Sequence, residues 1–140
     1  MLNYSLDIEK SKEVYEYFKD NLKIKECYNN VFNIFTLCPK TFRGGKWKIA
    51  YGYVSVLANL YCRHCFIIDN EGKVIDPTIF TSTEPNTQRE YFVMATFNNT
   101  DEYLNAIEND NYMPALENYL RDKDKQAYEW ANEKGYIFVA

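Results

Sequence analysis

The pattern of apolar and polar positions predicts two helices at the start of the chain. Residues 7–20 carry Val14 and Phe18 at helical spacing behind Asp7, which can cap the first turn. Residues 27–37 have apolar side chains three and four positions apart over much of their surface, which is typical of a central helix. A polar connector over 21–26 separates the two helices, and Pro39 is expected to end the second.

Four segments in the middle of the chain have the alternating aromatic and β-branched pattern of strands. They are 47–57, 60–68, 73–80 and 89–97. The connection Asp69-Asn70-Glu71-Gly72 has the composition of a hairpin loop. We expect the four strands to be neighbours in an antiparallel sheet, with helix 27–37 packed on one face.

The last third of the chain predicts a helical extension over residues 100–134. Breaks are expected near 109–114 and 122–124, Gly135 is expected to end the helix, and 136–139 could form an edge strand. Helices, then strands, then helices indicate an α+β fold. We predict a single domain over 1–140 with its core in 21–97.

Composition narrows the classes of function. The chain has thirteen Tyr and nine Phe, so the core should be rich in packed rings. The net charge is −4 and no basic patch is present, so nucleic acid is not an expected partner. No apolar run approaches the ~18 residues of a membrane span. No leader is visible in residues 1–5, so we expect a cytoplasmic protein with free thiols; its oligomeric state stays open.

The only histidine of the chain, His64, is placed to meet a carboxylate. It lies in predicted strand 60–68, and Asp76 follows twelve residues later in the next strand. Residues two apart share a face of a strand, so a three- or five-residue loop would put both side chains on one face. A slip of one residue would separate them. The sequence therefore predicts a His–Asp pair.

Cys27 is the best candidate for a nucleophile. It stands at the start of predicted helix 27–37, where the helix dipole and a nearby imidazolium would both stabilise a thiolate. Cys38 stands at the opposite end of that helix, where the dipole disfavours a thiolate. A small buried thiol near a helix start is the plainer alternative for Cys27.

Cys62 and Cys65 flank His64 in a Cys-x-x-Cys spacing that suggests two further possibilities. Redox pairs of this spacing sit at a helix start, whereas these two cysteines lie in a predicted strand and would face opposite ways. A zinc site could recruit them with His64 and either Cys27 or Cys38. We expect neither: Cys38, Cys62 and Cys65 should be unbridged, and no metal or cofactor is expected.

Four segments together resemble the transglutaminase-like branch of the papain-like cysteine enzymes. They are Cys27-Tyr28-Asn29-Asn30, Tyr51-Gly52-Tyr53-Val54, His64-Cys65-Phe66 and Val74-Ile75-Asp76-Pro77-Thr78. The resemblance covers residues ~24–80, a little over half of the chain. This chain has Cys65 where that family often has Ala, and Phe66 where it often has Trp. It also resembles small uncharacterised bacterial and phage-type chains with a Cys-Tyr-x-Asn start.

The resemblance implies a papain-like core and a role for each residue. Cys27 would be the nucleophile, His64 the general base and acid, and Asp76 the residue that orients His64. The Cys27 N–H and a second donor would hold the oxyanion, with Asn21 and Tyr53 as candidates. The expected function is a thiol-dependent hydrolase or acyltransferase acting on an amide, ester or thioester, with a peptide or protein amide as substrate. The alternative is a non-catalytic binding or inhibitor protein, directed at a phage or host target and built on the same fold.

Overall fold

The computed structural model describes residues 1–140 as six strands, five α-helices and two short 3₁₀-helices. The strands are β1 (Leu2–Tyr4), β2 (Trp47–Leu57), β3 (Leu60–Asp69), β4 (Val74–Ile75), β5 (Tyr91–Phe97) and β6 (Ile137–Val139). The helices are α1 (Ile8–Phe18), η1 (Lys19–Asn21), α2 (Cys27–Leu37), α3 (Pro39–Arg43), η2 (Pro77–Thr81), α4 (Thr100–Asn109) and α5 (Arg121–Lys134). The α+β prediction is confirmed.

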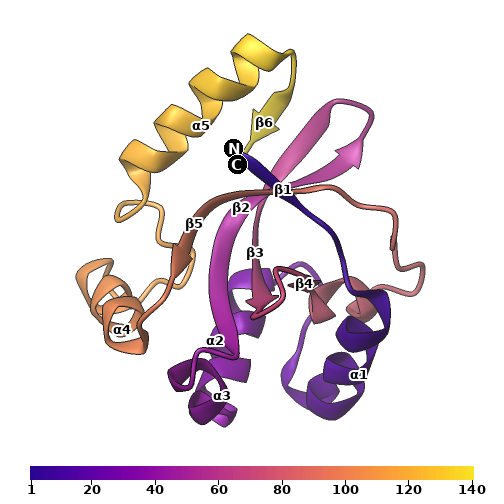
Figure 1. Ribbon diagram of the computed structural model, residues 1–140, viewed down its shortest axis with the longest axis vertical. Coiled ribbons are helices and arrows are strands. Elements are labelled where there is room, and N and C mark those ends of the chain that lie inside the picture. Colours follow the sequence, from indigo (N-terminus) through magenta and orange to yellow (C-terminus); the bar gives the residue numbers. More distant parts are fainter.

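One mixed sheet organises the molecule, with the long β2–β3 hairpin at its centre (Figure 1). The strand order is β1-β5-β2-β3-β4, and all of these neighbours are antiparallel. β6 lies parallel to the start of β3, pairing with Leu60–Cys62. On β3, β4 pairs only with Ile67 and Ile68, so the edge of β3 between β4 and β6 carries no strand.

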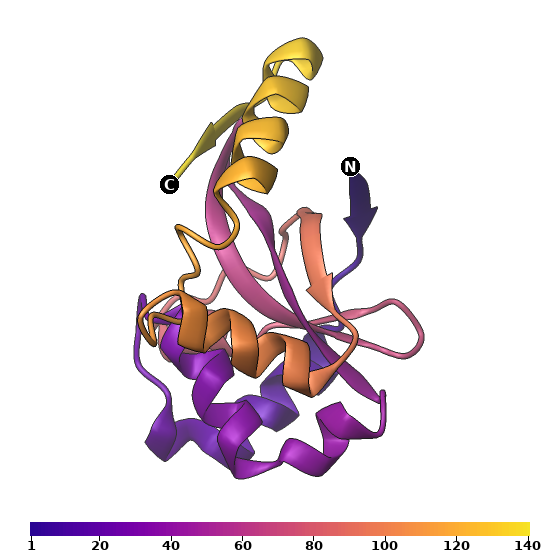
Figure 2. The ribbon, with the colours of Figure 1, turned by 90° about the vertical axis from the view of Figure 1, so that its left-hand side faces the viewer.

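The helices gather at two ends of this sheet. Helices α1, α2 and α3 lie at one end and α5 lies at the other, as both views show (Figures 1 and 2). Helix α2 buries Val31 and Ile34 in the largest core cluster, together with Tyr51 and Ile67 of the sheet. None of the helices is long and apolar enough to cross a lipid bilayer.

The aromatic composition fills the core as expected. Tyr53 stacks on Phe138 with ring centroids 4.2 Å apart, and Phe35 meets Tyr103 edge to face at 5.2 Å. The first pair joins β2 to the C-terminal strand β6, and the second joins α2 to α4. Such pairs contribute about 0.5–1.5 kcal/mol each beyond the area that they bury.

Arg63 attaches the C-terminal region to the core. Its side chain is only 4% exposed, and its Nε lies 2.9 Å from Asp124 of α5. Its Nη1 donates to the carbonyl of Ala115 at 2.6 Å and to the hydroxyl of Tyr28 at 3.2 Å. One buried guanidinium therefore links β3, α5, the 110–120 segment and the start of α2.

The third predicted strand is wrong over most of its length. Only Val74 and Ile75 pair with β3, and the chain then turns into η2 instead of continuing to residue 80. Pro77 has no N–H to offer to a strand ladder. The N–H of Asp76 donates to Ser11 of α1 and not to β3. The strand therefore ends where the candidate carboxylate begins.

Other boundaries differ from the prediction in smaller ways. The 89–97 segment forms β5 from Tyr91 and pairs with β2, and the first helix gives way to η1 after Phe18. The pattern missed β1 and α3, and α5 runs without a break through 122–124. The predicted stop at Gly135 is confirmed, because this residue caps α5 with φ = 81°.

Candidate active site

The turn between β3 and β4 brings His64 and Asp76 together. The Asp69 N–H donates to the carbonyl of Lys73, which closes a three-residue loop, and the Asp69 carboxylate accepts the N–H groups of Glu71 and Lys73. With this register Asp76 lies diagonal to His64 on the same face. His64 Nε2 is 2.8 Å from Asp76 Oδ2.

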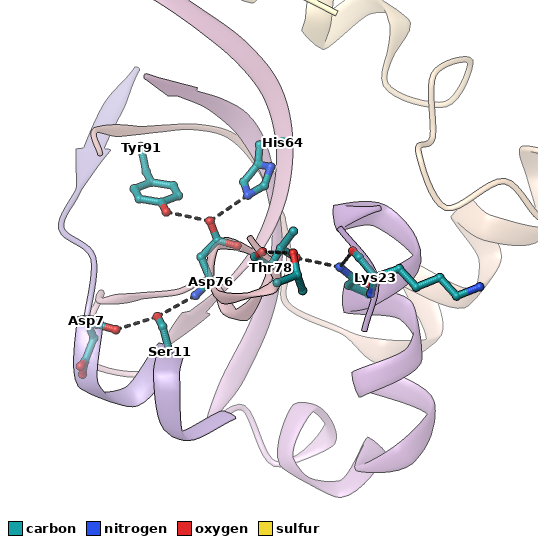
Figure 3. A network of polar contacts seen from close by, with 9 residues as sticks. Asp7, Ser11, Lys23, His64, Asp76, Thr78 and Tyr91 are labelled. Atoms are coloured by element: carbon teal, nitrogen blue, oxygen red, sulfur yellow. Dashed lines mark hydrogen bonds and ion pairs between the residues drawn. The ribbon is translucent and has the colours of Figure 1, made fainter. Parts of the chain in front are cut away.

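Neighbouring elements hold the Asp76 carboxylate in place (Figure 3). The hydroxyl of Tyr91 on β5 donates to the same Oδ2 at 2.7 Å. The Asp76 N–H donates to Ser11 Oγ at 2.9 Å, and that hydroxyl donates in turn to the carbonyl of Asp7. Asp76 is fully buried. The imidazole is therefore oriented by a carboxylate whose own position is fixed by hydrogen bonds and burial.

Cys27 begins α2, which packs against β3. The residue is 7% exposed, and its charge is one of the influences that raise the pKa of His64. Because Asp76 occupies Nε2, Nδ1 is the ring nitrogen left for the thiol. The structure thus pairs His64 directly with Asp76. Cys27, at the start of the helix that packs against β3, acts through its charge on the same imidazole.

The surroundings of His64 favour its protonated form. Burial by itself lowers the pKa of His64, but the charges of Asp76 and Cys27 and the hydrogen bonds to them raise it to about 10. Burial alone would raise the pKa of Asp76. The His64 cation and the hydrogen bonds from His64 and Tyr91 outweigh burial and bring the pKa of Asp76 below its usual value. An imidazolium next to a sulfur stabilises the thiolate.

Asn30 fixes the two loops that carry Cys27 and Asp76. Its side chain accepts the Lys23 N–H at 2.9 Å and donates to the Lys23 carbonyl at 2.8 Å. It also donates to Thr78 Oγ1 of η2 at 3.1 Å. The connector before the nucleophile and the turn after the carboxylate are therefore tied to one buried amide.

The N–H of Cys27 takes part in no hydrogen bond, as expected for the first residue of a helix. This donor beside the sulfur is available to an oxyanion.

The two candidates for a second oxyanion donor are not supported. Tyr53 pairs with Arg63, so its side chain lies on the sheet face opposite His64, and its hydroxyl donates to Asp124. Asn21 is exposed in η1, where its carbonyl accepts from Asn33, and it does not line the cavity beside His64. The Tyr53 prediction failed because adjacent strand residues point to opposite faces.

The cavity beside His64 has a volume of about 280 Å³. Its wall includes Lys25 of the connector, Thr78 of η2 and Arg89 just before β5. A larger cavity of about 600 Å³ lies between α1 and the start of β2 and contains none of the three candidate residues.

The remaining cysteines play no part in this arrangement. All four are free, and no group of three or more His, Cys, Asp or Glu side chains is placed to hold a metal ion. Cys62 shares the His64 face of β3, whereas Cys65 is fully buried on the other face. Burial raises the pKa of Cys65 and of Cys38. Both thiols are therefore poor nucleophiles at neutral pH.

The sequence pattern missed Tyr91, Asn30 and Ser11 as residues that support the site. Asn30 had a detectable signal, because it is a polar residue on the apolar stripe that also contains Cys27, Val31 and Ile34. Tyr91 and Ser11 had none, since their partners lie 15 and 65 positions away in the sequence.

We expect Asp76→Asn to lower the free energy of unfolding by about 2 kcal/mol at pH 6, because it removes one partner of a buried ion pair. The pKa of folded His64 lies above its ordinary value of 6.5, so the stabilisation is fully present below pH 6.5. It should fade as the pH rises toward about 10. The lowered pKa of Asp76 implies a second loss as the solution is acidified below pH 4. Urea unfolding of both proteins from pH 3 to 10 measures both losses, and a difference that grows as the pH rises above 6.5 would contradict the prediction.

No protein-family model, curated protein or solved structure matches this chain.

Proposed function

We propose that this protein is a thiol-dependent hydrolase or acyltransferase that acts on an amide, ester or thioester through Cys27, His64 and Asp76. The observation that carries the proposal is the imidazole of His64, which a buried carboxylate holds at 2.8 Å. It is supported by the position of Cys27 at the start of α2, from which its charge acts on that imidazole. The resemblance of the four sequence segments to transglutaminase-like enzymes supports it. We accordingly propose a papain-like core, with α2 as the central helix and the antiparallel part of the sheet behind it.

The reaction follows from the order of these groups. The Cys27 thiolate attacks the carbonyl carbon, a C–S bond forms, and the carbonyl electrons move onto oxygen. The N–H of Cys27 donates to that oxyanion. When the oxyanion collapses, the bond to the leaving group breaks and the leaving group takes the proton from His64. Asp76 keeps the imidazole in one orientation throughout.

The second half of the cycle releases the acyl group. Neutral His64 accepts a proton from an incoming water or amine, which attacks the thioester carbon. Collapse of the second oxyanion breaks the C–S bond, and the thiolate–imidazolium pair is restored. Water gives hydrolysis and an amine gives acyl transfer.

The test uses p-nitrophenyl acetate, an activated ester that makes few demands on specificity. We expect a burst of p-nitrophenol, with a mass gain of one acetyl group on the peptide that contains Cys27. Cys27→Ala should remove both signals and leave the fold intact, because it deletes one sulfur atom. Cys62→Ala is the matched control, because Cys62 is also a free thiol but lies outside the contacts of the triad.

Acetylation spread evenly over the four cysteines would contradict the proposal. The alternative of a binding protein would then be preferred, since a binder needs no selectively reactive thiol.

A further inference from the structure

The cavity beside His64 differs in charge from the rest of the molecule. Its polar wall is made by Lys25, Arg89, His64, Thr78, Thr81 and Ser82, and no carboxylate lines it. The chain as a whole carries a net charge of −4. The nearest carboxylate, that of Asp76, is fully buried and hydrogen-bonded to His64. The cavity is therefore a cationic site on an acidic protein.

The side chains of Lys25 and Arg89 in this wall form no ion pair in the protein. Neither Lys25 nor Arg89 belongs to any of the four ion pairs of the structure, which are Lys10–Glu13, Lys19–Glu16, Arg63–Asp124 and His64–Asp76. The Nε of Arg89 is buried and has no hydrogen-bond partner. A buried guanidinium donor left unpaired is costly and is usually found paired with an anion. The charge of Arg89 also acts on the buried carboxylate of Asp76, but its Nε donor remains available to a ligand.

Both cations are attached to the catalytic elements. Lys25 lies two residues before Cys27, in the connector held by Asn30. Arg89 lies two residues before Tyr91, which donates to Asp76. An anion that reached them would therefore sit next to His64, within one cavity of about 280 Å³.

We propose that this cavity binds a carboxylate of the substrate, so that the enzyme prefers acyl compounds with a negative charge close to the bond that is cleaved. Lys25 and Arg89 supply the positive charge, and the hydroxyl groups of Thr78, Thr81 and Ser82 are available as further donors. This inference rests on the proposed function, because it names the substrate class of the same site.

The test compares two alkylating reagents of nearly equal size, anionic iodoacetate and neutral iodoacetamide, at Cys27. We expect the ratio of the iodoacetate rate to the iodoacetamide rate to be higher at Cys27 than at Cys38 of the same protein. Lys25→Gln should lower the Cys27 ratio about fivefold, since it removes one partly exposed charge. Added NaCl should lower it as well.

Two controls complete the experiment. Lys40→Gln removes an exposed lysine of α3, away from the cavity lining, and should leave the ratio unchanged. Arg89→Gln should also lower the ratio, but its charge acts on Asp76 too, so Lys25→Gln is the cleaner variant. If Cys27 reacts fast with iodoacetamide but Lys25→Gln and Lys40→Gln give the wild-type ratio, the carboxylate site is wrong and the thiol enzyme stands. If Cys27 reacts no faster than Cys38 with iodoacetamide, the proposed function itself fails.

A further arm identifies the source of the carboxylate. N-acetylglutamate α-amide and N-acetylglutamine are isomers that exchange a side-chain carboxylate for a main-chain one. Protection of Cys27 from iodoacetamide by the first isomer would assign the cavity to acidic side chains, and protection by the second to chain ends. Equal protection by the uncharged N-acetylglutamine amide would overturn the proposal.

Discussion

Replacing His64 with Ala is expected to slow the alkylation of Cys27 by iodoacetamide about 100-fold at pH 6.5. An ordinary thiol with a pKa of about 8.5 is only about 1% thiolate at that pH. We expect the imidazolium of His64, which Asp76 keeps charged, to stabilise negative charge on the sulfur in the wild-type protein. Trapping with iodoacetamide for increasing times, followed by peptide mass spectrometry, gives the rate at each cysteine separately.

Three comparisons make this result specific. Cys38 serves as an internal reference, since its rate should not depend on His64. Asp76→Ala should slow Cys27 less than His64→Ala does, because it loosens the imidazole without deleting it. His64→Gln keeps an amide that can donate to Asp76 and tests whether the loss needs the charge. Equal rates in the wild-type and His64→Ala proteins would show that His64 does not activate Cys27.

Local sequence patterns were sufficient to predict the His64–Asp76 pair. His64 and Asp76 are only 12 positions apart, so one short turn fixes their geometry. The start of a helix at Cys27 was also predictable, because a helix start has a local signature, and α2 begins there. The contact between α2 and β3 could not be predicted in this way. It depends on the edge of β3 staying free between β4 and β6, and β6 lies at the other end of the chain.

The incorrect predictions concern features that the apolar and polar pattern alone does not determine. The segment after Ile75 has an apolar, strand-like composition, but Pro77 and the bond from Asp76 to Ser11 end the ladder. Tyr53 lies on the sheet face opposite His64, so its hydroxyl is not placed as a donor beside that residue. The supports of the site, Tyr91 and Asn30, bind partners brought together only by tertiary structure. Local patterns thus predict elements and reactive side chains, whereas the residues that hold those side chains still depend on topology.

Gly52 is the glycine at which we expect the largest effect of an added methyl group. It lies opposite His64 on β3, at the point where the register between β2 and β5 shifts. A Cβ here would lie 1.9 Å from the carbonyl oxygen of Phe92 and 2.9 Å from its carbon, which are backbone atoms and cannot rotate away. Gly52→Ala must therefore push β5 away from β2. We expect the free energy of unfolding to fall by about 4 kcal/mol or more, measured by urea denaturation.

The matched control is Gly135→Ala at the end of α5. Its φ of 81° costs an alanine about 1 kcal/mol, but no atom lies within 4 Å of the added Cβ. A shift of β5 should also carry Tyr91, the residue before Phe92, away from Asp76. Gly52→Ala protein that remains folded in dilute urea should therefore show slower alkylation of Cys27, whereas Gly135→Ala should react at the wild-type rate. If Gly52→Ala stays insoluble under conditions that yield soluble Gly135→Ala, the large destabilisation is supported. Equal stability of the two variants would mean that β5 does not approach β2 as closely as the structure has it.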